Sequence, residues 1–111
     1  MAIALVRQLN EDYLQDLCAL YQIAAPDRTR RDIRRMLANS DVVLGLVDDT
    51  SDRLVGFARI LTDFVYEALL LDVMIGESRQ GLGLGQYLME TVLALPELRA
   101  VRDIQVQCPP D

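Results

Sequence analysis

Histidine, lysine and tryptophan are all missing from this 111-residue chain, and cysteine occurs only twice. Without histidine, the Ser-His-Asp and Cys-His forms of nucleophilic catalysis are excluded. A zinc site is excluded as well, because Cys18 and Cys108 lie far apart and have no histidine with which to share a metal. We therefore expect no metal, and we interpret both cysteines as reduced thiols in the core.

Long apolar runs are also lacking. No segment approaches the roughly 20 residues that cross a bilayer, and residues 1–4 lead directly into a strand-like segment without a signal-like start. We therefore expect no membrane partner and a cytoplasmic location. The net charge of −6 argues against a nucleic-acid partner, which would need a basic surface. The length and the balanced composition predict one globular domain, residues 1–111.

Hydrophobic periodicity predicts a mixed α/β (α+β) fold with the element order β-α-α-β-β-β-α-β. The predicted strands are residues 2–9, 42–47, 54–61, 67–75 and 103–108. Two helices begin at the capping residues Asn10 and Thr29, and a third extends from residue 83 to residue 95. The run 67–75 is almost wholly apolar, which is typical of a central strand covered on both faces.

Three glycines at every second position, Gly81, Gly83 and Gly85, lie between a predicted buried strand and a predicted helix. This context favours phosphate binding, because glycines let the backbone approach an anion and the first N–H groups of the helix point at it. A P-loop is excluded because it needs a lysine. The dinucleotide pattern G-x-G-x-x-G fails because Gln86 or Leu88 occupies its third glycine position. The alternative is a glycine-rich turn that serves only close packing.

The spacing Gln80-x-x-Gly83-x-Gly85 matches the Q/R-x-x-G-x-G/A signature of the GNAT family of N-acetyltransferases. Residues 70–89 resemble the fourth strand, pyrophosphate loop and third helix of that family, and residues 55–59 are similar to its third strand. The predicted element order is also that of the family. The resemblance implies an enzyme that moves the acetyl group of acetyl-coenzyme A directly to a primary amine of unknown size.

The same resemblance implies which residues bind acetyl-coenzyme A. In the family, backbone N–H groups hold the pyrophosphate, and here this role falls on Gly81, Leu82, Gly83, Leu84, Gly85 and Gln86. The end of the fourth strand offers hydrogen bonds to the pantetheine arm and amides near the thioester carbonyl, a role that falls on Val73, Met74 and Ile75. Such donors would stabilise the oxyanion as the amine attacks.

The chain departs from the family at its end. Family members normally continue past the fifth strand into a fourth helix and two more strands, and a tyrosine on that helix often protonates the leaving thiolate. Because this chain stops at Asp111, we expect a C-terminally shortened domain that lacks this acid, or one that another chain completes. An uncovered sheet edge would favour a homo-oligomer. The alternative function is a non-catalytic coenzyme A binding or protein-interaction module.

Charged residues suggest two further features. Asp72 is the only charge within residues 68–75, and it is a candidate general base because burial could raise its pKa. The alternative is that Asp72 lies in a wet notch or hydrogen-bonds a neighbouring loop. A group of arginines could select an anionic acceptor or a partner protein, or could form a solvated helix face: Arg28, Arg30, Arg31, Arg34 and Arg35.

Overall fold

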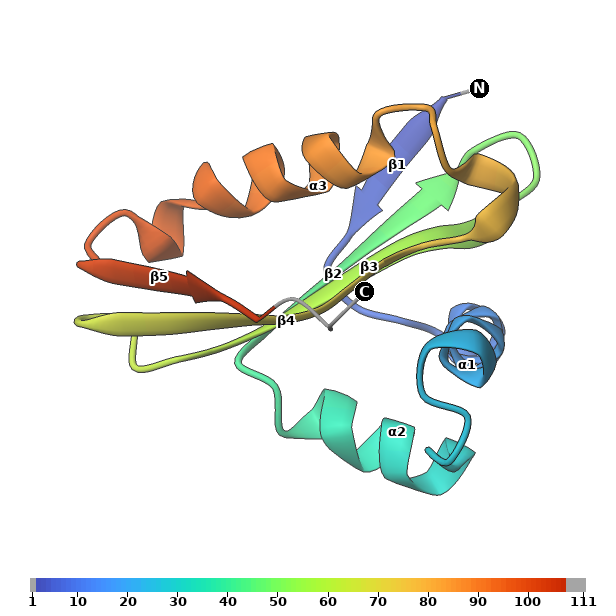
Figure 1. Cartoon of the computed structure of the whole chain (residues 1–111), viewed down its shortest axis with the longest axis horizontal. Helices are drawn as coiled ribbons and strands as arrows, with labels where there is room; N and C mark the ends of the chain where they lie inside the picture. The colour runs from blue at the N-terminus through green and yellow to red at the C-terminus, as the bar shows by residue number, and fades with distance from the viewer. Residues whose placement is uncertain (1, 108–111) are drawn as a thin grey trace.

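Five strands form one sheet within residues 2–107, which are the residues that the computed structural model describes. The strands are β1 (Ile3–Val6), β2 (Val42–Asp48), β3 (Arg53–Thr62), β4 (Glu67–Ile75) and β5 (Asp103–Val106). Their order in the sheet is β1-β2-β3-β4-β5 (Figure 1). Neighbours from β1 to β4 pair antiparallel, whereas β4 and β5 pair in parallel.

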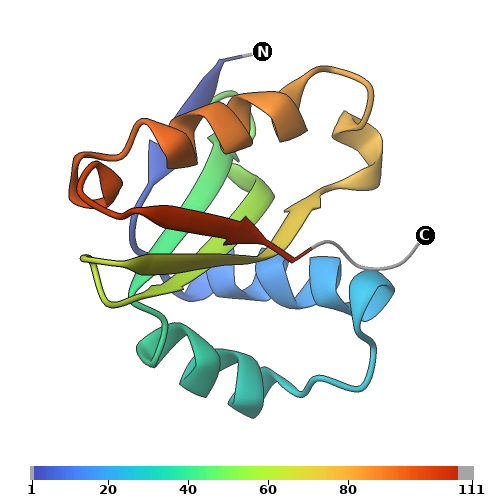
Figure 2. The same ribbon diagram turned by 60° about the vertical axis from the view of Figure 1, so that its left-hand side comes forward.

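Three helices cover the two faces of the sheet, namely α1 (Glu11–Ala24), α2 (Arg30–Ala38) and α3 (Leu84–Leu93). α3 lies on one face, and α1 and α2 lie on the other (Figure 1, Figure 2). The mixed α+β class and the element order predicted from the sequence are confirmed. None of the helices within residues 2–107 is long and apolar enough to cross a membrane.

The predicted capping residues begin the first two helices. Asn10 Oδ1 accepts a hydrogen bond from Tyr13 N–H at 2.8 Å, and Thr29 Oγ1 accepts one from Asp32 N–H at 3.1 Å. Each oxygen satisfies an N–H group that has no partner inside the helix. Local sequence therefore sets where both helices start.

Two apolar clusters hold the helices on the sheet. The cluster under α3 includes Leu44, Ile60, Leu70, Leu88 and Val92. The cluster under α1 and α2 includes Leu14, Leu17, Tyr21, Ile33 and Phe57. The sheet is thus buried on both faces, as the apolar run 67–75 predicts.

Three predicted boundaries differ from the structure by two residues or more. The first strand ends at Val6 and not at residue 9, because Leu9 leaves the sheet and packs against the cluster under α1 and α2. The third helix ends at Leu93, because Leu95 precedes Pro96 and takes an extended conformation. The last strand ends at Val106, and its predicted end at residue 108 lies outside the described residues.

The predicted core thiols can be followed for one cysteine only. Cys18 is half-buried, forms no disulfide and packs against the cluster under α1 and α2. Cys108 lies outside the described residues. The prediction of a reduced core thiol therefore holds only in part for Cys18, since its side chain is not fully enclosed.

A β-bulge interrupts β4. Two of its residues, Asp72 and Val73, lie opposite the single residue Ala58 of β3. Asp72 has a φ angle of 56°, in the left-handed region that a residue with a side chain rarely adopts. Bulges of this kind change the direction in which a strand points its side chains. Asp72 therefore leaves the simple alternation of the strand.

β4 and β5 diverge beyond the first half of β4. Their pairing runs from Glu67 opposite Asp103 to Leu70 opposite Val106. Residues 71–75 of β4 still pair with β3, but no strand within residues 2–107 pairs with their other edge. Backbone N–H and C=O groups on that edge are available to a ligand.

Replacing Leu88 by Ala is expected to lower the free energy of unfolding by about 2–5 kcal/mol, because a fully buried side chain would leave a cavity between α3 and the sheet. The matched control is Leu93→Ala on the same helix, where the side chain is 58% exposed and the cost should stay below about 0.5 kcal/mol. Urea unfolding of both variants measures the difference. Equal costs would contradict the packing described for α3.

Candidate functional site

A glycine-rich loop joins the end of β4 to the first turn of α3. After Ile75 the chain forms a short 3₁₀ helix (Glu77–Arg79), and Gly83 is the N-cap of α3. Gly81 and Gly83 have φ angles of 81° and 78°, in the left-handed region that glycine adopts without strain. The two glycines therefore allow the path by which the loop reaches the helix.

Backbone N–H groups at the end of this loop have no hydrogen-bond partner in the part of the chain that the structure describes. The hydrogen bonds of α3 begin with Tyr87 N–H, which donates to Gly83 O at 3.0 Å. The amides of residues 81–86 find no acceptor among residues 2–107. The first turn of α3 also carries no acidic side chain that would compete for them. With the positive end of the helix dipole behind them, these amides form an anion-binding surface.

A pocket of about 370 Å³ lies between the loop and the end of β4. Six of the residues that the sequence predicts for cofactor binding line it: Val73, Ile75, Gly81, Gly83, Leu84 and Gly85. The pocket adjoins the unpaired edge of β4 at residues 71–75. One elongated ligand can therefore meet both the loop amides and the strand edge.

The side chains of the other three predicted residues lie elsewhere. Met74 packs against the cluster under α1 and α2, Leu82 is exposed, and Gln86 Nε2 donates to Glu90 Oε1 at 3.0 Å. The sequence assigns these residues a role through their backbone N–H groups, which their side-chain positions do not test. For Met74, Leu82 and Gln86 that role stays a prediction.

Two side chains fasten the loop to the sheet. Gln80 Nε2 donates to Ile75 O at 3.3 Å, and Arg79 Nη2 lies 2.9 Å from Asp48 Oδ2 at the end of β2. Hydrogen bonds from Arg79 and from Thr50 N–H hold the pKa of the Asp48 carboxyl below its usual range. The Arg79–Asp48 ion pair is therefore intact at neutral pH and positions the loop.

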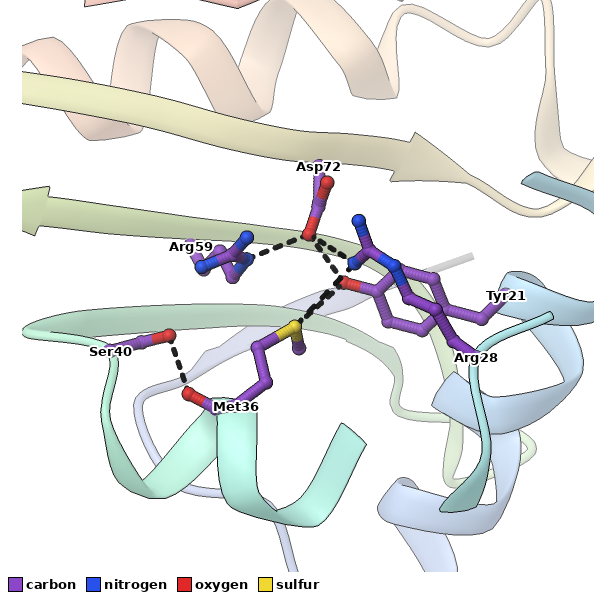
Figure 3. Close-up of polar contacts among 6 residues, drawn as sticks. All are labelled: Tyr21, Arg28, Met36, Ser40, Arg59 and Asp72. Atoms are coloured by element: carbon purple, nitrogen blue, oxygen red, sulfur yellow. Dashed lines mark hydrogen bonds and ion pairs between the residues drawn. The ribbon is translucent and has the colours of Figure 1, made fainter. Parts of the chain in front are cut away.

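A second polar cluster surrounds Asp72, on the face of the sheet that α1 and α2 cover (Figure 3). Asp72 Oδ2 accepts a hydrogen bond from Arg59 Nε at 2.7 Å. The same oxygen accepts from the Tyr21 hydroxyl at 2.8 Å and from Arg28 Nη1 at 2.9 Å. These donors come from β3, from α1 and from the loop between α1 and α2, so the Asp72 cluster joins α1 and this loop to the sheet.

The expectation that burial raises the pKa of Asp72 is wrong. Burial does favour the neutral acid, but hydrogen bonds from Arg59, Tyr21 and Arg28 outweigh it and hold the pKa of the Asp72 carboxyl below its usual range. Burial and the Asp72 carboxylate instead raise the pKa of Tyr21. At neutral pH Asp72 is therefore a carboxylate of low basicity and Tyr21 is a neutral phenol.

The arginines of residues 27–35 divide into two groups. Arg34 and Arg30 lie 2.5 Å and 3.2 Å from Glu11, and these contacts, Arg34 first, lower the pKa of Glu11 to about 2. All the arginines of this segment except Arg28 are exposed, as a solvated helix face predicts. Arg28 differs because it reaches Asp72 and lies over the Tyr21 ring, 4.9 Å from its centroid.

A second pocket, of about 230 Å³, lies beside the Asp72 cluster. Its lining residues are Arg28, Asp32, Ile33, Met36 and Arg59. The pocket therefore combines two guanidinium groups with one carboxylate and an apolar wall from α2.

Sequence reasoning did not identify Tyr21 and Arg59 as members of a site. Arg59 offers a signal, because it is the only charge within residues 54–61 and lies on the strand next to Asp72. A lone cation and a lone carboxylate on adjacent apolar strands predict an ion pair. Tyr21 offers no such signal, because its spacing is that of any core residue on an amphipathic helix.

Replacing Asp72 by Asn is expected to lower the free energy of unfolding at pH 7 by about 1–3 kcal/mol, because its donors lose a charged acceptor. The pKa of Asp72 is lowered by folding, so this stabilisation is present above the ordinary pKa of aspartate and is lost as the pH falls through the folded-state value. Urea unfolding at pH 7 and pH 3 measures the change.

The control is Asp27→Asn, at an exposed position in the loop between α1 and α2, which should cost less than about 0.5 kcal/mol at both pH values. A cost for Asp72→Asn that did not shrink at pH 3 would contradict the ion pairs assigned to Asp72.

Solved acetyltransferases share this fold. A putative acetyltransferase of the GNAT family from Xanthomonas campestris pv. campestris matches with a TM-score of 0.82 at 25% identity, covering 98% of this chain and 77% of that chain. An aminoglycoside 6'-N-acetyltransferase complexed with coenzyme A matches with a TM-score of 0.68 at 20% identity, covering 83% of this chain and 53% of that chain.

Curated proteins of similar sequence are also N-acetyltransferases by name. The uncharacterized N-acetyltransferase ycf52 of Porphyra purpurea is 30% identical over 107 residues, which are 95% of this chain and 60% of that protein. The chloroplastic serotonin N-acetyltransferase 2 of Oryza sativa subsp. japonica is 37% identical over 102 residues, which are 86% of this chain and 50% of that protein. The chain thus spans 50–60% of the length of these relatives.

The family model described as the acetyltransferase (GNAT) family matches residues 6–109, which is almost the whole chain. The glycine loop, the bulged strand β4 and the helix α3 all lie inside this match. The chain belongs to the GNAT acetyltransferase family.

Proposed function

We propose that this protein transfers the acetyl group of acetyl-coenzyme A to a primary amine. One observation carries the proposal: in a member of this family, the free amides of residues 81–86 open onto a pocket beside the unpaired edge of β4. The loop offers donors for a pyrophosphate, and the edge offers hydrogen bonds for an amide-containing arm. Acetyl-coenzyme A carries both groups.

The donor would bind in an extended form. Its pyrophosphate would lie against the amides of residues 81–86, at the positive end of α3. Its pantetheine arm would run along residues 73–75, beyond the point where β5 leaves β4 at Leu70. The thioester would then reach the end of β4 next to the bulge.

Transfer by direct attack fits the side chains of this chain. The amine nitrogen would attack the acetyl carbonyl carbon, so that a C–N bond forms and the C–S bond breaks, with the electron pair leaving on sulfur. Backbone N–H groups of residues 73–75 are the proposed donors to the oxyanion. Direct attack needs no protein nucleophile, which agrees with a chain that has no histidine.

Asp72 remains the candidate for contact with the incoming amine. It lies one residue before the proposed donor-binding segment, and its Oδ1 atom has no hydrogen-bond donor among residues 2–107. Because the pKa of Asp72 is lowered, its carboxylate suits the attraction of an ammonium group better than the removal of its proton. In this proposal the proton leaves through water next to Asp72.

The comparisons support the donor more strongly than the acceptor. The aminoglycoside enzyme of the same fold was solved with coenzyme A, and the rice relative is named for acetylating serotonin. Both acceptors carry a primary amine. We therefore propose a primary amine as the acceptor class.

Gly83→Glu is expected to abolish acetyl-coenzyme A binding in calorimetric titration of the purified chain. The new side chain would strain a backbone with φ of 78° and would place a negative charge where the pyrophosphate is proposed to lie. The matched control is Leu93→Glu, which adds the same charge at an exposed position on the same helix and should bind as the wild type does.

Circular dichroism shows whether each variant folds. Binding by a folded Gly83→Glu variant, or no binding by the folded wild type, would refute the assigned donor site. Binding without acetylation of any amine in a broad panel would favour the alternative, a non-catalytic coenzyme A module.

A further inference from the structure

Arg59 is a half-buried cation with unused hydrogen-bonding capacity. Its side chain is only 15% exposed, and its Nε atom donates to Asp72 Oδ2. Its two Nη atoms contact no acceptor among residues 2–107, and Arg59 lines the pocket of about 230 Å³. The guanidinium presents these donors in a planar fork that matches a carboxylate.

Charge in the Asp72 cluster is unbalanced. The guanidinium groups of Arg59 and Arg28 share the single carboxylate of Asp72, which leaves one positive charge. Asp32 is the other acidic residue lining the pocket, but it is exposed and forms no ion pair within residues 2–107. An anion of single charge would therefore balance the buried part of the pocket, and desolvation makes such balance valuable.

We propose that this pocket binds a carboxylate of the acceptor, so that the preferred amine is an amino acid, with its carboxylate on the Arg59 Nη atoms and its amine beside Asp72 Oδ1. The proposed carboxylate site defines the acceptor class of the proposed transferase, and it therefore rests on the proposed function. A single negative charge fits the surplus better than the double charge of a phosphate.

The neighbouring residues agree with a zwitterionic ligand. Arg28 adds a second cation beside Arg59, and its side chain is 37% exposed, so it can turn towards a ligand at modest cost. Met36 and Ile33 supply an apolar wall for the carbon atoms of the acceptor. The arginines that pair with Glu11 lie on the exposed part of α2 and offer a contrast within the same segment.

Matched amines test the proposal by steady-state kinetics. Each set contains an amino acid, its amide and the amine without a carboxylate, and three sets use the side chains of alanine, leucine and phenylalanine. Each kcat/KM is calculated from the concentration of the neutral, deprotonated amine, because the amine pKa differs within a set. The amino acid should exceed both analogues in kcat/KM by roughly 10- to 100-fold in at least one set. This factor corresponds to the free energy of hydrogen bonds to a charged group.

Arg59→Gln should remove this preference without changing the affinity for acetyl-coenzyme A. Arg59→Lys keeps the charge but lacks the planar fork, so it should retain part of the preference. This variant provides the test if Arg59→Gln folds poorly. Arg34→Gln is the control, because Arg34 pairs with Glu11 on the surface and should leave the preference intact. Equal rates for acids and amides in every set, or an equal loss for all amines in Arg59→Gln, would overturn the proposal.

A second readout does not depend on turnover. The ¹H–¹⁵N signal of the Arg59 Nε–H group is followed while the chain is titrated with the N-acetylated amino acid or with its amide. A shift with the acid alone supports the carboxylate site even if no amine is acetylated, in which case only the proposed transferase fails. Acetylation of amines without such a shift refutes the carboxylate site and leaves the transferase standing.

Discussion

The contact between Asp72 and its three donors is the interaction on which the rest of the structure depends. One carboxylate oxygen joins β4, β3, α1 and the loop before α2. Two guanidinium groups and a phenol would each lose water on burial, so their arrangement is stable only while that oxygen is ionised and in place. The bulge and the left-handed backbone at Asp72 put it there. Three charge-assisted hydrogen bonds to Asp72 thereby offset the cost of its strained backbone conformation.

The bulge also decides on which face of the sheet the side chains at the end of β4 lie. Val73 and Ile75 pack on the α3 side and line the pocket next to the glycine loop. Asp72 meets its partners on the side of α1 and α2. In the proposed reaction the acyl donor and the amine therefore approach the same strand from opposite faces. Two substrates that enter separately can then meet at one short segment of backbone.

The sequence predicts the layers and the glycine loop well, because both follow from local patterns. Period-2 and period-3.6 hydrophobicity predict the elements, and the glycine spacing predicts the loop that the structure places at the start of α3. The Asp72 cluster is less local: Arg59 lies on the preceding strand, but Tyr21 comes from α1, 51 residues away from Asp72. The bulge left no sequence signal either. The direction of the Asp72 pKa shift follows from that unseen geometry, which is why burial alone gave the wrong sign.

The divergence of β4 and β5 has a consequence for the behaviour of the chain in a crowded cell. No strand of the described part of the chain pairs with one edge of residues 71–75, and such an edge can add a strand from any other extended chain. A ligand bound along this edge would satisfy its backbone groups and cover them. Under the proposed function, substrate supply and protection from aggregation would be coupled, and the chain would be most exposed to aggregation when its substrate is scarce.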